Sequence, residues 1–249
     1  AHSGGNHLNQ IINHGYLAVD FFFMLSGFVI GYAYDDRWNR MSTGTFFKRR
    51  LIRLQPMVVM GSIVGAALFW FQDAPCYPAM EGVSAGAVLL VMLLGCTLLP
   101  LPLKWDVRGW MEMHPLNGPA WSLYYEYIGN ILYALFIRKF SKTALTVLVA
   151  IAACFTVHRC LTAPAGDIVG GWALNWEQQY VGLVRLMYPF FGGLLLSRLG
   201  WLIRTRKNAF GWCSLMIIAV LSAPRIGGED GYWMNGLYEA FCIICIFPV

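Results

Sequence analysis

Eight hydrophobic segments separated by short polar loops dominate this chain of 249 residues. The segments are Leu17–Tyr34, Leu54–Phe71, Val83–Leu103, Pro119–Ile137, Thr143–Val157, Tyr180–Leu199, Ala209–Ala223 and Tyr232–Val249. Most of them approach the roughly 20 residues that an α-helix needs to cross a bilayer. Because lipid offers the backbone no hydrogen-bond partner, each crossing segment must be helical. The sequence therefore predicts an all-α, polytopic transmembrane helix bundle of about seven or eight hydrophobic segments.

The composition agrees with a membrane protein, since 58% of the residues are hydrophobic and only 12% are charged. Soluble domains carry about 25% charged residues. The net charge of +5 does not indicate nucleic-acid binding, because the basic residues lie between hydrophobic segments. The seven cysteines lie mostly in apolar runs, so we interpret them as packing residues. We expect one transmembrane domain over residues 1–249, incomplete at both ends.

Lys and Arg predict the orientation of the bundle. Thirteen of the eighteen fall in three clusters, namely Arg37, Arg40, Lys48, Arg49, Arg50 and Arg53; Arg138, Lys139 and Lys142; and Arg198, Arg204, Arg206 and Lys207. The positive-inside rule places all three clusters on the cytoplasmic side. Three hydrophobic segments separate the first cluster from the second, although only an even number of crossings returns the chain to one side. We expect Val83–Leu103 to be bent or re-entrant, because Pro100 and Pro102 interrupt its end.

Polar side chains inside two of the segments are the first candidates for chemistry. Asp20 interrupts LAVDFFFMLSGFVIGYAY, and Ser122, Glu126 and Asn130 are spaced four apart in PAWSLYYEYIGNILYALFI. An ionised side chain at the centre of a bilayer costs roughly 2.5–3.5 kcal/mol, so a partner, a cavity or a substrate should compensate it. Two structural alternatives stay open. Asp20 is close enough to the interface to be solvated, and the other three residues suit an interhelical hydrogen-bond ladder.

The basic run FFKRRLIRLQP is a second motif, in which Arg50 and Arg53 are three apart and share a helix face. One interpretation is a topogenic anchor that binds anionic lipid. The alternative is a cytoplasmic phosphate site, since arginine donates two parallel hydrogen bonds to phosphate. Gly27 and Gly31 suit a close helix-packing face beside Asp20.

Three histidines, His2, His7 and His14, precede the first segment on the side opposite the basic clusters. A histidine near an intramembrane carboxylate is a candidate for acid–base chemistry near neutral pH.

Together these motifs resemble the acyltransferase 3 family of integral membrane acyltransferases. The stretch HGYLAVDFFFMLSGFVIGYAYDDRWNRMSTGTFFKRRLIRLQP is similar to that family's second-helix and third-helix region. The stretch NGPAWSLYYEYIGNILYAL is similar to its Trp-Ser-Leu…Glu helix, and LVRLMYPFFGGLLL to a later Arg…Phe-Phe-x-Gly helix. The resemblance implies a bundle of about ten helices that moves an acyl group, usually acetyl, from cytoplasmic acyl-CoA to a hydroxyl of an envelope or exported glycan.

The resemblance also implies roles for individual residues. His2 stands where the family places its catalytic histidine, with His14 as the second candidate, and Asp20 or Glu126 would orient and charge-balance the imidazole. Arg50 and Arg53 would hold the phosphates of the acyl-CoA co-substrate. We expect Trp121, Ser122 and Arg185 to bind substrate, and we expect no metal.

A multi-pass protein of the plasma (inner) membrane follows from these expectations, with the lipid bilayer and a hydroxyl-bearing acceptor as its partners. A transporter or flippase that uses the intramembrane carboxylates as a substrate pathway is the main alternative. A membrane sensor or scaffold without turnover is a third.

Overall fold

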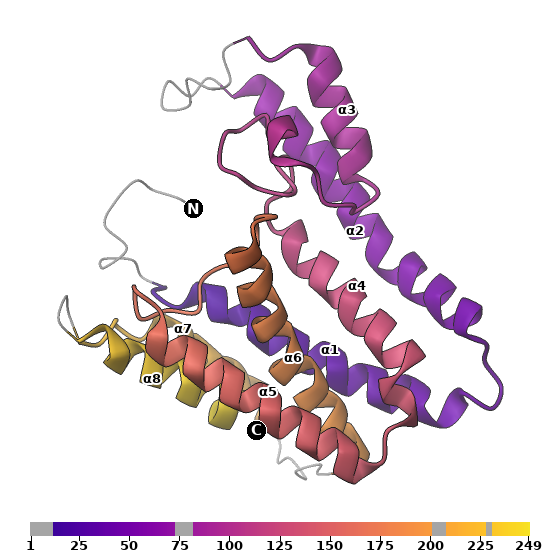
Figure 1. The fold of residues 1–249 in the computed structure, drawn as a ribbon, viewed down its shortest axis with the longest axis vertical. Coiled ribbons are helices and arrows are strands. Elements are labelled where there is room, and N and C mark those ends of the chain that lie inside the picture. Colours follow the sequence, from indigo (N-terminus) through magenta and orange to yellow (C-terminus); the bar gives the residue numbers. More distant parts are fainter. Residues whose placement is uncertain (1–11, 73–81, 201–207, 228–230) are drawn as a thin grey trace. The chain divides into compact units, whose positions relative to one another are not determined.

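The computed structural model describes residues 12–72, 82–200, 208–227 and 231–249 (Figure 1). These residues form eight α-helices, and no strand occurs among them. The helices are α1 (Ala18–Tyr34), α2 (Thr43–Phe71), α3 (Ala85–Gly95), α4 (Ala120–Leu135), α5 (Lys142–Thr162), α6 (Trp176–Leu199), α7 (Ala209–Ser222) and α8 (Tyr232–Phe241). Each predicted hydrophobic segment overlaps one helix, so the predicted all-α bundle is confirmed.

Within the part of the chain that the structure describes, four helical stretches are long and apolar enough to cross a membrane, namely Gly15–Arg37, Thr43–Phe71, Lys142–Thr162 and Trp176–Leu199. The chain is therefore a multi-pass membrane protein. Serine side chains fix the starts of three helices. Ser42, Ser84 and Ser141 each accept a hydrogen bond from a backbone N–H in the first turn of α2, α3 and α5. Such N-caps satisfy donors that have no partner within the helix.

The chain divides into two compact units. The first comprises residues 1–36, 140–169 and 184–249, and thus contains α1, α5, α7, α8 and most of α6. The second comprises residues 37–139 and 170–183, and thus contains α2, α3, α4 and the start of α6.

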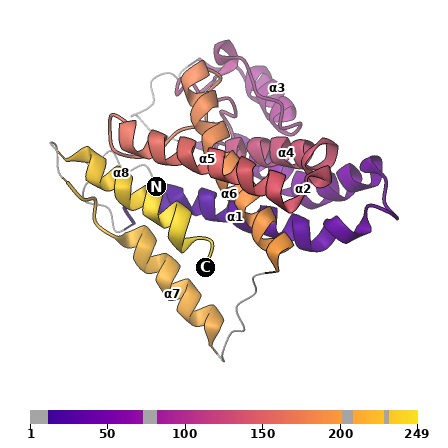
Figure 2. The ribbon, with the colours of Figure 1, turned by 60° about the horizontal axis from the view of Figure 1, so that its bottom comes forward.

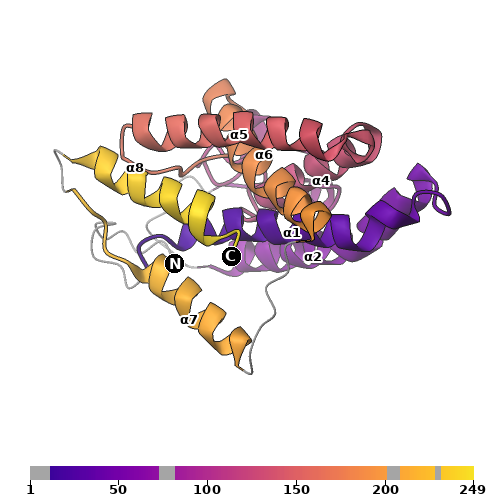
Figure 3. The same cartoon turned by 90° about the horizontal axis from the view of Figure 1, so that it is seen from below.

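Glycines bring helix backbones into direct contact in the first unit. A Cβ atom at Gly27 of α1 would overlap the carbonyl oxygen of Phe190 of α6, and one at Gly31 would meet Ser197. The predicted packing face of α1 is therefore confirmed. The helices α5 and α8 pack against each other in the same way (Figure 2), because a Cβ atom at Gly236 would overlap the carbonyl oxygen of Cys160. Figure 3 shows the same pair of helices from below.

The second unit packs α3 and the loop after it against α2. Its apolar core contains Ala66, Phe69, Val88, Val91, Leu101 and Leu116. The helix α3 has 11 residues and rises about 17 Å, which is well short of the ~30 Å hydrocarbon core. The chain turns at Leu98, whose φ is 61°, and the Leu101 N–H then donates to the Met113 carbonyl at 2.9 Å. Val83–Leu103 is thus no straight spanning helix, as predicted, while its re-entrant path stays a prediction.

Candidate functional site

A buried ion pair joins Asp20 and Arg185 in the first unit. The Arg185 Nε donates to Asp20 Oδ1 at 3.2 Å, and its Nη2 donates to Oδ2 at 2.7 Å. The same Nη2 donates to the Tyr16 carbonyl at 2.7 Å. Because Asp20 is 0% and Arg185 is 1% exposed, the alternative of a solvated Asp20 is wrong. Asp20 was expected to need a partner for its charge inside the membrane. That partner is Arg185, which was itself a predicted site residue.

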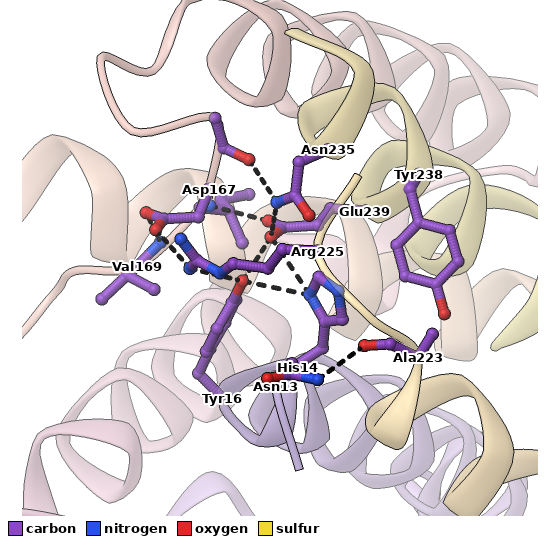
Figure 4. Close-up of polar contacts among 12 residues, drawn as sticks. Asn13, His14, Tyr16, Asp167, Val169, Ala223, Arg225, Asn235, Tyr238 and Glu239 are labelled. Carbon is purple, nitrogen blue, oxygen red and sulfur yellow. Dashed lines mark hydrogen bonds and ion pairs between the residues drawn. The ribbon is translucent and has the colours of Figure 1, made fainter. Parts of the chain in front are cut away.

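A second polar network lies in the same unit and centres on Glu239 of α8 (Figure 4). The Tyr16 hydroxyl donates to Glu239 Oε1, and the backbone N–H of Ile168 donates to Oε2 at 2.8 Å. His14 completes this arrangement, since its Nδ1 is 3.2 Å from the Tyr16 hydroxyl and 3.5 Å from Glu239 Oε1. Both His14 and Glu239 are 0% exposed, so these two side chains are shielded from bulk water.

Three further side chains hold the network in place. The Asn235 amide nitrogen donates to Glu239 Oε1 at 2.9 Å and to the Gly166 carbonyl at 2.6 Å. Arg225 donates from Nη2 to Asp167 Oδ2 at 2.7 Å and to the Tyr16 hydroxyl at 3.3 Å (Figure 4). A carboxylate, a phenol and an imidazole are therefore fixed together by charged and amide groups, which is a chemically competent arrangement for moving protons.

Arg50 and Glu126 form the corresponding ion pair of the second unit. The Arg50 Nη2 donates to Glu126 Oε1 at 2.5 Å, with the two side chains 1% and 16% exposed. The pair links α2 to α4, so two residues predicted for different roles lie in contact. Arg53, the other residue predicted to bind CoA, is exposed on the surface of α2.

The other two residues of the predicted polar stripe, Ser122 and Asn130, bond to the backbone of their own segment. The Ser122 hydroxyl donates to the Pro119 carbonyl at 2.9 Å, and the Asn130 amide donates to the Glu126 carbonyl at 2.7 Å. These contacts do not form the interhelical ladder that the spacing allowed. Trp121 packs edge-on against Tyr125, with ring centroids 6.0 Å apart.

The loop before α4 contains a buried histidine of the second unit. His114 is 2% exposed, and neither of its ring nitrogens has a hydrogen-bond partner among the described residues. Burial lowers the pKa of His114 from 6.5 to about 4, so the ring is neutral at pH 7. Burial also raises the pKa of the Glu112 carboxyl, although Arg108 lies 3.6 Å away.

The structure thus pairs four of the predicted site residues, Asp20 with Arg185 and Arg50 with Glu126. His2 lies outside the described residues, and the substrate-binding roles of Trp121, Ser122 and Arg185 stay predictions. Glu239 was missed, although it stands in a hydrophobic segment as Asp20 does. The criterion that selected Asp20 and Glu126 would have found it.

A family model described as an acyltransferase domain matches residues 1–249. The chain belongs to this acyltransferase family. The resemblance of its motifs is thereby confirmed, and both units lie within the matched acyltransferase domain.

Two curated relatives are similar over about half of the chain. "Protein 2 in picA locus" of Rhizobium radiobacter is 33% identical over 126 residues, which cover 48% of this chain and 64% of that protein. "Acyltransferase MdmB" of Streptomyces mycarofaciens is 28% identical over 138 residues, which cover 55% of this chain and 32% of that protein. The chain therefore spans less than two thirds of the length of either relative. No solved structure matches it.

Proposed function

We propose that this chain is part of a membrane-embedded O-acyltransferase of the plasma (inner) membrane. It moves an acyl group from cytoplasmic acyl-CoA to a hydroxyl of an envelope or exported glycan. The acyl group that we propose is acetyl. The observation that carries the proposal is the buried network of His14, Tyr16 and Glu239 within a membrane acyltransferase. Buried ionisable groups in a membrane bundle mark functional sites by default.

The acyl donor, acyl-CoA, would bind at the basic N-terminal part of α2. A CoA phosphate is best held by guanidinium groups, because they donate in a planar fork. Arg53 is exposed and is therefore the residue that would bind phosphate directly. Arg50 is held by Glu126, so it would position α2 instead of binding phosphate itself.

The acceptor hydroxyl is a poor nucleophile and needs a base as it attacks the acyl carbon. His2 would either take the hydroxyl proton directly or carry the acyl group for one step. In the direct reaction the hydroxyl oxygen bonds to the acyl carbon and the carbon–sulfur bond breaks. The CoA thiolate then leaves and receives the proton. Asp20 is neutralised by Arg185, and this closed ion pair suits a fixed scaffold better than the open substrate pathway of a transporter.

The full-length protein in liposomes with radiolabelled acetyl-CoA tests this proposal. Wild-type protein should release CoA and label a soluble hydroxyl acceptor, whereas the His2→Ala variant should do neither at normal membrane levels. A matched control is His158→Ala, because His158 is an exposed residue of α5. Movement of a glycan across the membrane without release of CoA would instead support a flippase. Activity that persists in His2→Ala would remove His2 from the mechanism.

A further inference from the structure

An open apolar groove of about 730 Å³ runs along one face of α2 in the second unit. Its lining residues all belong to this helix, and they are Leu51, Ile52, Gln55, Pro56, Val59, Met60, Ile63 and Val64. The spacing of three and four between these positions places them on one side of the helix. This side is exposed, since 65% of Ile52 and 55% of Met60 is accessible. The other side of α2 packs into the second unit, as the buried Leu54 and Val58 show.

The side chains of this groove offer a ligand almost no hydrogen bonds. Gln55 is the one polar residue among those that line it. The Gln55 amide nitrogen donates to the Cys96 carbonyl, and the amide oxygen accepts a hydrogen bond from the Tyr127 hydroxyl at 3.5 Å. Both polar atoms of Gln55 are therefore engaged with other parts of the second unit. A hydrocarbon chain suits such a groove, whereas a sugar or a nucleotide base would lose its hydrogen bonds to water there.

The length of the groove is comparable with the thickness of one leaflet of a bilayer. Leu51 and Val64 are 13 positions apart, which corresponds to about 20 Å along a helix. The hydrocarbon of one leaflet is about 15 Å thick, which is half of the ~30 Å core. The stretch Thr43–Phe71 is also long and apolar enough to cross a membrane. A lipid acyl chain can therefore lie along the groove within a single leaflet.

Positive charge lies at the N-terminal end of the groove. Arg49 precedes Ile52 by three residues and Lys48 precedes it by four, so both lie one turn before the groove on its side of the helix. Both side chains are exposed, and neither forms an ion pair or a hydrogen bond with the residues that the structure describes. The helix α2 contains no Asp or Glu. An anionic group beside the apolar groove would complement this charge.

We propose that α2 binds one anionic phospholipid, with an acyl chain in the groove and the phosphate against Lys48 and Arg49. The positive-inside rule assigns this end of α2 to the cytoplasmic surface, where anionic lipids attract basic side chains. The acetyl-CoA of the proposed reaction has no long chain that could fill the groove. A symmetric contact between two copies of α2 would bring the same positive charges together. This lipid site goes beyond the proposed acyl transfer and does not depend on it.

Native mass spectrometry of the full-length protein in detergent tests the charged end of the site. The probes are phosphatidylglycerol and phosphatidylcholine with identical acyl chains. One basic residue near an anionic headgroup strengthens binding about five-fold, so the wild-type protein should prefer one phosphatidylglycerol by about 25-fold. The double variant Lys48→Gln with Arg49→Gln should lose this preference. The matched control is Arg37→Gln with Arg40→Gln, which removes two exposed charges of the same basic cluster outside α2 and should keep the preference.

A second pair of variants tests the apolar part of the site. Ile63→Trp puts an indole into the groove, so it should weaken the binding of both lipids several-fold while the preference for phosphatidylglycerol is retained. Leu68→Trp is the matched control, because Leu68 is an exposed apolar residue of α2 that does not line the groove. Both variants keep the helix apolar and able to insert. Unchanged lipid binding in Ile63→Trp would show that the acyl chain does not lie in the groove.

Several other results would overturn the lipid site. Equal binding of the two lipids by wild-type protein, or loss of the preference in the Arg37 and Arg40 control, would show that Lys48 and Arg49 do not select the headgroup. Displacement of phosphatidylglycerol by CoA alone would assign these two residues to the acyl donor. Palmitoyl-CoA that displaces the lipid where CoA does not would make the groove a site for a donor acyl chain. A protein dimer that excludes the lipid would make it an interface between copies of the chain.

Discussion

Arg185 holds both carboxylate oxygens of Asp20 in a two-point contact, at 3.2 Å from Nε and 2.7 Å from Nη2, with neither residue more than 1% exposed. The two residues lie on α6 and α1, so the contact fixes one helix against the other within the first unit. An ion pair removed from water in this way is sensitive to the loss of either partner, because the remaining charge stays buried.

Neutralising Asp20 should therefore destabilise the first unit more than the substitution of an exposed residue does. We expect Asp20→Asn to lower the free energy of unfolding by about 3–5 kcal/mol, since Arg185 would keep an unpaired buried charge. Thermal unfolding in detergent, followed by size-exclusion chromatography, measures the loss. The double variant Asp20→Asn with Arg185→Gln should recover part of it. A single variant as stable as wild type would show that the pair contributes nothing.

Adding a methyl group at Gly27 should separate α1 from α6. The new Cβ would overlap the Phe190 carbonyl oxygen, and backbone atoms cannot rotate away as side chains do. Gly27→Ala should cost about 1–3 kcal/mol or more in the same unfolding assay. Gly211→Ala of α7 is the control, because nothing lies within 4 Å of its added Cβ. That control should be neutral or slightly stabilising, since alanine is the better helix residue.

The two arginines of the basic motif should respond differently to lysine. Arg53→Lys removes the planar fork but keeps the charge, so the KM for acyl-CoA should rise several-fold while kcat changes little. Arg50→Lys should weaken the contact with Glu126 and lower the unfolding temperature instead. Arg40→Lys is the control, because Arg40 is an exposed residue of the same basic cluster. It should change neither the KM for acyl-CoA nor the unfolding temperature. An unchanged KM in Arg53→Lys would favour the lipid-anchor interpretation of the motif.

His114 should make the protein sensitive to acid. Below pH 6.5 the unfolded chain binds a proton at His114 that the folded chain, with a pKa of about 4, does not bind. The folded state therefore loses stability as the pH falls from 6.5 toward 4, by about 2 kcal/mol at pH 5. Thermal unfolding at pH 7.5 and pH 5 should show a smaller acid effect in His114→Phe than in wild type. Equal acid effects in both proteins would contradict a neutral buried ring.

Cysteine labelling tests the predicted topology. In a background without native cysteines, we expect Lys104→Cys and Lys142→Cys to react with an impermeant thiol reagent from opposite faces of the membrane. Both side chains are exposed, so the reagent can reach them. Labelling of both positions from one face would mean that the positive-inside count gave the wrong path for Val83–Leu103.

The helices were predictable because hydrophobicity is a local property of the chain, whereas their ends depend on other groups. Hydrophobicity predicted a segment from Leu54, but α2 begins at Thr43 because Ser42 caps it and the basic residues continue the helix. Conversely, α3 ends at Gly95 although apolar residues continue to Leu103, because the chain turns at Leu98 and bonds to Met113.

The partners of the buried charged residues could not be predicted from the sequence, for a different reason. Spacing within one helix shows which residues share a face, but not which helix lies opposite. Asp20 and Arg185 are 165 positions apart, and Tyr16 and Glu239 are 223 apart. Each of these residues can be recognised from the sequence as a polar residue in or beside an apolar segment. Its partner can be identified only from the three-dimensional structure.

The 223 positions between Tyr16 and Glu239 have a consequence for how the protein is made. At about 5–20 residues per second, a ribosome needs roughly 10–45 s to reach Glu239 after Tyr16 has been synthesised. During that interval Tyr16 and the Ile168 N–H lack the carboxylate that they contact in the finished protein. Until α8 is inserted, these polar groups of the first unit therefore lack a partner that they have in the folded protein. A nascent chain that stalls before α8 should be short-lived, because α8 supplies the carboxylate that Tyr16 and the Ile168 N–H contact.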